Sequence, residues 1–421
     1  MNAIKQLRNS SIFYVAAIAM ACSSNAFAQT RYTVADQGTL ANDNFGMVMG
    51  LNNQGWTQNM DGNGKAPVLS LSTTLLSGRA VMNVNGRNID LLTLGGENSW
   101  TNYGGINDRG DNVGLSETPD PDPDGEDFCG FHTNRTCRGF LWRNGHMTAL
   151  PTLGGNNAQA AAINNREQIV GISETGALDP SCPSGTTAKT IAPVLWEKGE
   201  ARALPTLPGE PDGFAQGINN EGQAVGSSGV CGNISMHAVL WENGTVSQLP
   251  DLGVAGGIAY AMNNHNQAIG WVPTADGSTI VASIWQKDRA TGVITITTLP
   301  LLPGDGAAFA TGINNRGQVV GSTFKDGAWS HGFIGQDGMV TDLNTLIPED
   351  SNLRIVAASN INERTNLRHG IGDCRPRCGH SPRHSVDSCR PTVGMSVQVS
   401  RTRLPTRNSP HRWEHESVRR D

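Results

Sequence analysis

The sequence contains few lysines and few aromatic residues, and beyond residue 28 it has no long apolar run. A membrane-spanning helix needs about 20 consecutive apolar residues, so no such helix is expected in the mature chain. The residue patterns of a Ser-His-Asp triad, a paired-carboxylate glycosidase and a phosphate-binding loop are also missing. The sequence therefore offers no catalytic residue, no cofactor-binding residue and no metal ligand, and it favours a protein that is not an enzyme.

Positive charge is scarce in most of the chain. Residues 29–363 contain 17 basic and 32 acidic residues, whereas residues 364–421 contain 12 arginines, no lysine and 5 acidic residues. Because phosphate binding requires clustered cations, the acidic body argues against nucleic acid as a partner. The small net charge of the whole chain therefore conceals two segments of different composition.

Residues 1–28 have the composition of a signal peptide. Lys5 and Arg8 give a positive start, an apolar run too short to span a bilayer follows, and Ala26-Phe27-Ala28 forms a small-x-small cleavage site. We therefore expect a secreted protein, extracellular or periplasmic. The alternative is a lipoprotein modified at Cys22, which the missing upstream leucine of a lipoprotein signal disfavours.

Internal repetition is the strongest pattern in the chain. The motif Ile-Asn-Asn-x-Gly-Gln-x-Val-Gly has close copies that begin at Ile106, Ile163, Ile218, Met262 and Ile313, a weaker copy at Leu51 and a seventh start at Ile361. Successive copies are 44 to 57 residues apart. A second motif alternates with the first and ends in the tryptophans Trp142, Trp196, Trp241 and Trp285, as in His237-Ala238-Val239-Leu240-Trp241.

Both motifs predict β-hairpins. The first motif needs a residue in the left-handed region at the end of its turn, where glycine fits without steric cost and asparagine nearly so. That position holds Gly55, Gly110, Gly222, Gly317 and Asn266, whereas Glu167 is an exception that should be strained or use another turn. The second motif turns at Asn85-Gly86, Asn144-Gly145, Asn243-Gly244 and Asp337-Gly338. Two hairpins per unit make four strands.

Four strands per unit, repeated about seven times, predict an all-β fold, a β-propeller of about seven four-stranded blades formed by residues 29–364. The recurrent tryptophans should pack between blades. Residues 32–40 resemble the last strand of a unit and should complete the final blade, closing the ring. A two-sheet solenoid is the alternative arrangement.

Residues 365–421 depart from the repeat. After Ile361-Asn362-Glu363-Arg364 the expected second and third strands are not recognisable, and the chain becomes rich in Arg, His, Pro, Ser and Cys. We expect an incomplete last blade, an imperfectly closed ring and a poorly ordered tail. An altered reading frame or a recent fusion is our preferred explanation, and a disordered basic tail is the alternative.

The alternating motifs resemble the HAF family of extracellular repeat proteins, whose His-Ala-Phe tripeptide is matched by His237-Ala238-Val239 and His331-Gly332-Phe333. The resemblance covers roughly residues 32–364. It implies an exported protein of largely unassigned role and brings no catalytic residues with it.

Seven cysteines lie outside the signal segment. A disulfide between Cys129 and Cys137 is expected in an oxidising compartment, and one between Cys182 and Cys231 requires that neighbouring insertions touch. The spacing of Cys374, Cys378, Cys389, His380 and His384 fits no usual zinc pattern. Asp120 to Gly125 begins like a calcium loop, but Phe131 replaces the glutamate that such a loop needs, so a solvated acidic loop is expected.

The function favoured by these observations is a non-catalytic binding or cell-surface interaction module with an extracellular glycan or protein ligand. The insertions around 117–137 and 174–190 should lie together on one rim and present an acidic, loop-rich face. The alternative is a carbohydrate-active enzyme, a lyase or hydrolase, on a propeller scaffold. A degraded gene product without function is a third possibility, suggested by the tail.

Overall fold

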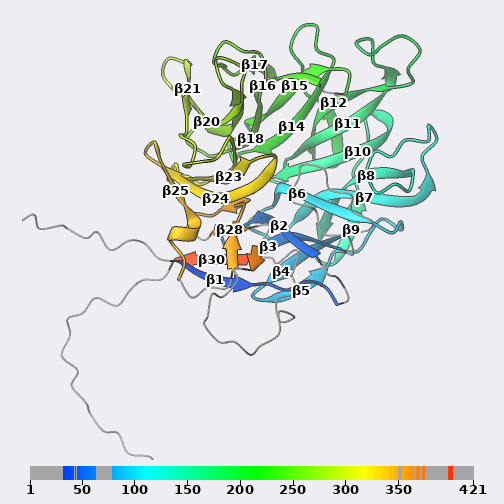
Figure 1. The fold of residues 1–421 in the computed structure, drawn as a ribbon. Helices are drawn as coiled ribbons and strands as arrows, with labels where there is room; N and C mark the ends of the chain where they lie inside the picture. The colour runs from blue at the N-terminus through cyan, green and yellow to red at the C-terminus, as the bar shows by residue number, and fades with distance from the viewer. Residues whose placement is uncertain are drawn as a thin grey trace, which may run out of the picture.

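The computed structural model describes residues 32–62 except 42 and 44, 78–348 except 233, 353–364, and three short strands within 367–401. Six four-stranded antiparallel sheets are arranged radially, so the fold is an all-β propeller (Figure 1). The expected signal peptide lies outside the described residues.

Each of the six blades is a meander of four consecutive strands. Blade 1 comprises β2 (Phe45–Leu51), β3 (Thr57–Gly62), β4 (Arg79–Val84) and β5 (Arg87–Asp90); blade 2 comprises β6 (Ser99–Ile106), β7 (Asn112–Pro121), β8 (Arg135–Arg143) and β9 (His146–Ala149); blade 3 comprises β10 (Gly154–Ile163), β11 (Ile169–Leu178), β12 (Lys189–Glu197) and β13 (Glu200–Ala203). Blade 4 comprises β14 (Asp212–Ile218), β15 (Ala224–Val230), β16 (Ile234–Glu242) and β17 (Thr245–Gln248); blade 5 comprises β18 (Ile258–Met262), β19 (Gln267–Pro273), β20 (Ile280–Lys287) and β21 (Ile294–Thr298); blade 6 comprises β22 (Ala307–Ile313), β23 (Val319–Lys325), β24 (Ala328–Gln336) and β25 (Met339–Asp342).

A further sheet, here called the terminal sheet, joins the two ends of the chain. Its strand order is β1 (Tyr32–Asp36), β30 (Val397–Arg401), β28 (Leu367–His369) and β27 (Asn360–Ile361). The sequence shows no recognisable second and third strand after Ile361, and in this sheet β28 and β30 occupy those places. Backbone pairing requires no repeat motif, and Val397-Gln398-Val399 has the alternation of a strand. Outside this sheet, β26 (Leu353–Ile355) pairs with β29 (Gly372–Cys374), and η1 (Leu343–Thr345) follows β25.

The turns have the predicted backbone conformations. Gly222 has φ +85° and Asn266 has φ +60° in the first hairpins, and Asn243-Gly244 has positive φ at both residues, as a type I′ turn requires. Glu167 also lies in the left-handed region, with φ +65°. Its carboxylate forms ion pairs of 3.0 Å with Arg109 and with Arg143. These contacts offset part of the steric cost of a side chain at that position.

The recurrent tryptophans connect successive blades, as predicted. Trp196, Trp241 and Trp285 are almost completely buried. Their indole nitrogens donate to the carbonyl oxygens of Pro151, Pro205 and Pro250, at 2.7, 2.6 and 2.8 Å. Each proline lies in the linker that precedes the blade containing its tryptophan. The hydrophobic core is divided into separate clusters between neighbouring blades.

A bulge recurs in the innermost strands. The register shifts by one residue between Ala160 and Ala162 in β10, and corresponding shifts occur in β2, β14, β18 and β22. A bulge changes the direction of a side chain and bends the strand. In this fold it lies next to the propeller axis, where the candidate site is found.

Candidate functional site

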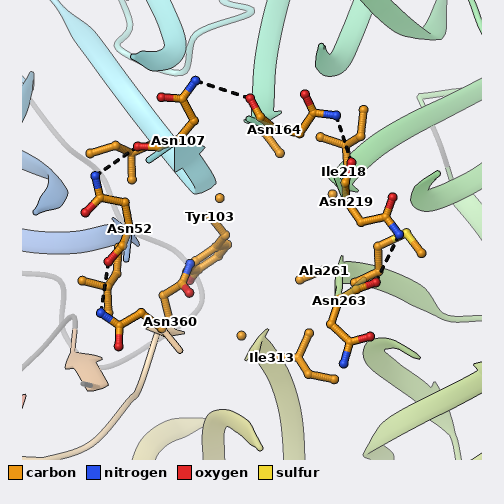
Figure 2. Close-up of a pocket in the computed structure, with 18 of the residues that line it drawn as sticks. Asn52, Tyr103, Asn107, Asn164, Ile218, Asn219, Ala261, Asn263, Ile313 and Asn360 are labelled. Atoms are coloured by element: carbon orange, nitrogen blue, oxygen red, sulfur yellow. Dashed lines mark hydrogen bonds between the residues drawn. The ribbon is translucent and has the colours of Figure 1, made fainter. Parts of the chain in front are cut away.

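A closed ring of hydrogen bonds surrounds the propeller axis. It is formed by the first asparagine of each repeat, and we call it the asparagine ring: Asn52, Asn107, Asn164, Asn219, Asn263, Asn314 and Asn362. Figure 2 labels five of its members, Asn52, Asn107, Asn164, Asn219 and Asn263. Each side-chain amide donates to the backbone carbonyl of the next member, over distances from 2.9 to 3.3 Å. The last member, Asn362, donates to Asn52 at 3.0 Å. The expectation of an imperfectly closed ring was therefore wrong at the axis.

The repeat motif is explained by the bonds of one ring member. The side-chain oxygen of Asn219 accepts the backbone N–H groups of Glu221 and Gln223, both at 3.0 Å, and so holds the hairpin turn. Its amide nitrogen also donates to the side-chain oxygen of Gln223 at 2.7 Å. The asparagine and the glutamine of the motif thus have structural roles. The asparagine side chain shapes its own turn and also binds the next blade.

The second residue of each repeat forms a parallel ring. It consists of Asn53, Asp108, Asn165, Asn220, Asn264, Asn315 and Glu363, and each backbone N–H donates to the side-chain oxygen of the next member. Both oxygens of Asp108 are engaged, one by the N–H of Asn53 and the other by the amides of Asn53 and Asn165. The carboxylates of this ring therefore act as structural acceptors.

The two rings border a cavity of about 190 Å³ on the axis. The apolar residue that precedes each ring asparagine lines it: Leu51, Ile106, Ile163, Ile218, Met262, Ile313 and Ile361. Tyr103, Tyr260, Thr311 and Asn360 add polar groups. No lysine, arginine or histidine contributes to this lining among the described residues.

Tyr103 departs most clearly from the repeat. Four residues of β6, Asn102 to Gly105, face the single residue Val113, whereas the other bulges contain one extra residue. Gly104 has φ +78°, and the amide of Asn102 anchors the bulge to the carbonyl oxygen of Ala160 at 3.0 Å. The wider bulge directs Tyr103 into the channel (Figure 2).

Tyr260 reaches the same cavity from blade 5. Its ring lies edge-on to that of Tyr103, with 6.4 Å between centroids, and its hydroxyl accepts a hydrogen bond of 3.2 Å from the indole of Trp271. Burial, followed by the proximity of Tyr260, raises the pKa of Tyr103 to about 12. Both hydroxyls therefore stay protonated at neutral pH. Sequence reasoning missed this pair, although Tyr103-Gly104-Gly105 is the signal that could have revealed it.

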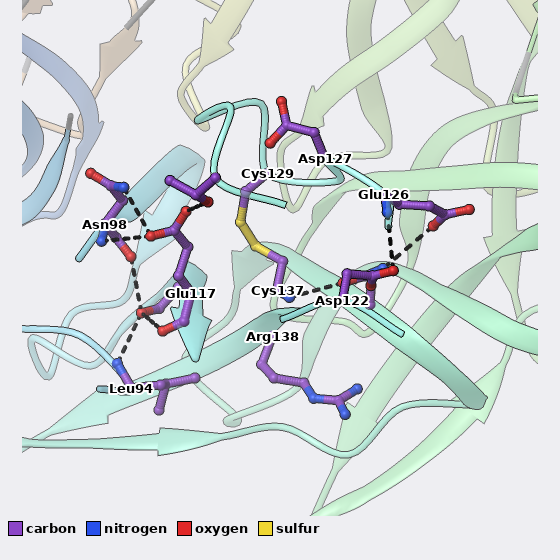
Figure 3. Close-up of a disulfide and its surroundings, with 12 residues drawn as sticks. Leu94, Asn98, Glu117, Asp122, Glu126, Asp127, Cys129, Cys137 and Arg138 are labelled. Carbon is purple, nitrogen blue, oxygen red and sulfur yellow. Dashed lines mark hydrogen bonds between the residues drawn. A yellow bond between two sulfur atoms is a disulfide. The ribbon is translucent and has the colours of Figure 1, made fainter. Parts of the chain in front are cut away.

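The insertions form the second candidate site, here called the insertion rim: loops 122–134 of blade 2 and 179–188 of blade 3, with the turn at Cys231-Gly232 of blade 4. All three connect the second and third strands of a blade and so lie on the same face. Disulfides join Cys129 to Cys137 and Cys182 to Cys231, and the second one links blades 3 and 4. Figure 3 shows the first disulfide and its surroundings.

Hydrogen bonds join the loop of blade 2 to blade 3. Asp122 accepts from the amide of Asn157 at 2.8 Å, and Asp124 accepts from Asn156 at 2.7 Å and pairs with Lys189. Asp122 and Asp124 of the predicted acidic loop thus accept from protein donors. One oxygen of Asp122 also accepts the backbone N–H groups of the residues two and four positions further on.

Two carboxyl groups meet under this loop. A hydrogen bond between Glu126 and Glu174, followed by burial, raises the pKa of Glu126 to about 7. Glu174 is 3% exposed, and one of its oxygens accepts the N–H groups of Asn156 and Asn157.

The other residues singled out in the sequence are structural or lie elsewhere. His237 pairs with Glu210 at 2.6 Å, and His331 pairs with Asp305 at 2.9 Å. Within the part of the chain that the structure describes, the one group of three close metal-ligand candidates is Asp179, Cys182 and Cys231, and its cysteines are joined in a disulfide. The side chains of Cys374 and the other cysteines and histidines of the tail lie outside the described residues.

Comparisons with known proteins give only distant structural similarities. The chain is a β-propeller; no family model and no curated protein matches it. Among solved structures, it is similar to the acylaminoacyl peptidase of Pyrococcus horikoshii, with 10% identity and a TM-score of 0.42 over 81% of this chain and 52% of that one. The chain thus spans about half of that enzyme's length.

Two further solved structures complete the comparison. A gluconolactonase, XC5397 from Xanthomonas campestris, has 11% identity and a TM-score of 0.40, over 90% of this chain and 93% of that one. The β-propeller domain of the Trilobed protease from Pyrococcus furiosus has 9% identity and a TM-score of 0.34, over 72% and 96%. Among the described residues no helix has the length and apolarity needed to cross a bilayer.

Proposed function

We propose that this protein is an exported, non-catalytic binding module of the HAF type, with the terminal sheet as its seventh blade, and that the insertion rim holds an extracellular glycan or protein. Blade 6 connects its second and third strands with the two-residue turn Asp326-Gly327, so the fold itself needs no insertion at this position. The loops of blades 2 and 3 nevertheless contain two disulfides and several ordered contacts. The scaffold does not require these loops, yet disulfides and hydrogen bonds hold them in place, and this observation carries the proposal.

The surface of the rim suits a polar or positively charged partner. Asp124 is exposed there and paired with Lys189, and Asp120 is exposed at the end of β7 that leads into the rim. Burying such carboxylates favours partners that supply hydrogen-bond donors or cations. The disulfides and the export signal are consistent with an oxidising compartment.

The alternative, a lyase or hydrolase on the propeller scaffold, has less support. Carboxyl pairs of glycosidases are about 5 to 9.5 Å apart. The oxygens of Glu126 and Glu174 are instead engaged beneath the loop by Asn156 and Asn157. The axial cavity contains no free carboxylate pair among the described residues, because Asp108 is fully bonded.

Shortening the insertions tests the proposal. In one variant, residues 122–134 and 179–188 are each replaced by Asp-Gly, the turn of blade 6, and Cys137→Ala and Cys231→Ser remove the unpaired thiols. The wild type should bind defined ligands on a glycan array or on the surface of the producing cell, and the shortened variant should lose that binding. Asp120→Lys, an exposed single change, provides a milder variant that should weaken binding without altering thermal unfolding. Undiminished binding by both folded variants would refute the role of the rim.

A further inference from the structure

We infer that the axial cavity is a second binding site, separate from the insertion rim, and that it takes a small, neutral, polyhydroxylated molecule no larger than one sugar ring. The inference goes beyond the proposed function, because it concerns the centre of the propeller and a different ligand. It rests on the shape of the cavity, its charge and the two tyrosines that enter it.

The strand β6, which lines the cavity, departs from the repeat at the point where a ligand would bind. Five innermost strands share a one-residue bulge, in which the extra residues are Met49, Ala161, Gln216, Tyr260 and Thr311. In β6 the bulge has three extra residues, two more than in those strands, and it includes Gly104 with φ +78°. A wide bulge weakens strand pairing, and bulges of this kind concentrate next to functional sites, where they direct a side chain. The side chain directed here is Tyr103.

The hydroxyl of Tyr103 is the available polar group. Among the described residues no hydrogen bond to this hydroxyl is found, although the side chain lines the cavity. The hydroxyl of Tyr260 has one bond, from Trp271, and Thr311 donates to the carbonyl oxygen of Ala358 at 2.7 Å. A phenol can donate one hydrogen bond and accept others, so a ligand with hydroxyl groups fits these partners.

Charge disfavours an anion most strongly. The described lining has no cationic side chain to pair with an anion. Its carboxylates, Asp108 and Glu363, accept backbone N–H groups of the second ring, and both oxygens of Asp108 are engaged. An anion would lose hydration without a counter-charge, whereas a neutral polar molecule would exchange water hydrogen bonds for protein ones.

Size limits the ligand further. The axial cavity has a volume of about 190 Å³. Pockets for drug-sized molecules are about 300 to 1,000 Å³. The ring of Tyr103 and the collar of Ile106, Ile218 and Ile313 would cover the apolar side of a single sugar ring.

The test uses the full-length protein and small soluble probes. Saturation-transfer NMR would be recorded with glucose, galactose, mannose and N-acetylglucosamine as neutral probes, and with glucosamine and glucuronate as charged probes of similar size. We expect at least one neutral probe to bind with a Kd below about 10 mM and to perturb the tyrosine absorption spectrum, and the charged probes to bind at least about tenfold more weakly.

Variants locate the site. Tyr103→Phe should weaken binding of the neutral probe about 2- to 10-fold, because one hydrogen bond is lost. Tyr32→Phe, the matched change outside the cavity, should leave binding unchanged. If Tyr103→Phe fails to fold, the tyrosine difference spectrum of the wild type still decides the question. The inference is overturned if no neutral probe binds, if glucuronate or glucosamine binds as tightly, or if folded Tyr103→Phe binds like the wild type. Loss of ligands by the shortened rim variant would not affect this result, so the two proposals fail independently.

Discussion

The side-chain amide of Asn362 lies 3.0 Å from the backbone carbonyl oxygen of Asn52, a hydrogen bond between residues 310 positions apart in the chain. It is the last of seven equivalent bonds, and it connects the start of the terminal sheet to blade 1. The turns of the first hairpins thus form a continuous circle although the strands of the terminal sheet come from both ends of the chain.

Replacing a ring asparagine should destabilise the propeller. Asn219→Ala removes two backbone acceptor contacts and two donor contacts, and we expect a loss of about 2–4 kcal/mol of unfolding free energy. Asn362→Ala should be similarly costly, because it opens the circle between the terminal sheet and blade 1. Urea unfolding measures both effects, with the exposed Gln248→Ala as a control expected within about 0.5 kcal/mol of wild type. If Asn362→Ala left the unfolding free energy unchanged, the closure would add no stability.

Glu167→Gly should change stability in a salt-dependent way. Glycine relieves about 1–2 kcal/mol of left-handed strain, but the ion pairs with Arg109 and Arg143 are lost. The two effects should nearly cancel at low ionic strength. In about 1 M salt, where screening weakens exposed pairs, the variant should be more stable than the wild type. Thermal unfolding at two salt concentrations checks this, and a variant less stable than wild type in high salt would contradict the interpretation.

Asp61 should make stability depend on pH. Burial is the main reason that its pKa rises to about 7, and one of its oxygens has no partner among the described residues. Because the folded-state pKa lies above the ordinary value of 3.8, no stability is lost below about pH 4. As the pH rises through 7, the buried carboxylate must ionise and stability falls. Asp61→Asn should therefore stabilise the protein at pH 8 by up to about 4 kcal/mol and have little effect at pH 4.

Chemical unfolding of wild type and Asp61→Asn at both pH values tests this dependence. Asp337→Asn, at an exposed turn where other repeats carry asparagine, is the matched control and should alter neither value. An equal effect of Asp61→Asn at pH 4 and pH 8 would rule out ionisation as the cause.

Trp241→Phe should weaken the contact between blades 3 and 4. The change leaves the carbonyl oxygen of Pro205 without its indole donor and creates a small void, at a cost of about 2–4 kcal/mol. Trp56→Phe is the comparison, because Trp56 is only half-buried and makes no indole hydrogen bond within the described residues. Thermal denaturation should separate the two variants clearly; equal losses would indicate that ring volume alone matters.

Breaking the disulfide between Cys182 and Cys231 should release the loop of blade 3. The Cys182→Ser and Cys231→Ser double variant should lose about 2–4 kcal/mol of stability and become sensitive to proteolysis within 179–188. Limited proteolysis followed by mass spectrometry identifies the cut. A loop that resists cleavage without the bridge would show that its hydrogen bonds suffice.

The fold class was predictable because each hairpin carries its own local signal. Gly222 and Asn243-Gly244 mark positive φ within a few residues, and Trp241 marks the buried third strand. These signals depend on steric and burial preferences of single residues, which the sequence displays directly.

The candidate sites were harder to predict, because their contacts join distant units. Nothing local to Asn362 indicates Asn52 as its partner, and the strands β28 and β30 carry no repeat motif. Tyr103 enters the axis only because Asn102 to Gly105 bulge from β6, a distortion that depends on register with Val113. The insertion rim was predictable in position, but the proximity of Glu126 to Glu174, which raises the pKa of Glu126, requires coordinates.

The circle of asparagines also constrains how such a gene can change. Every amide must reach the carbonyl of the next repeat, so the angular step between repeats is tied to their number. Duplication or deletion of one repeat would leave a donor and a carbonyl unmatched, or would require every neighbouring pair to rotate. The number of repeats is therefore restrained by the geometry of the asparagine ring, while the outer loops remain free to lengthen or shorten in each repeat.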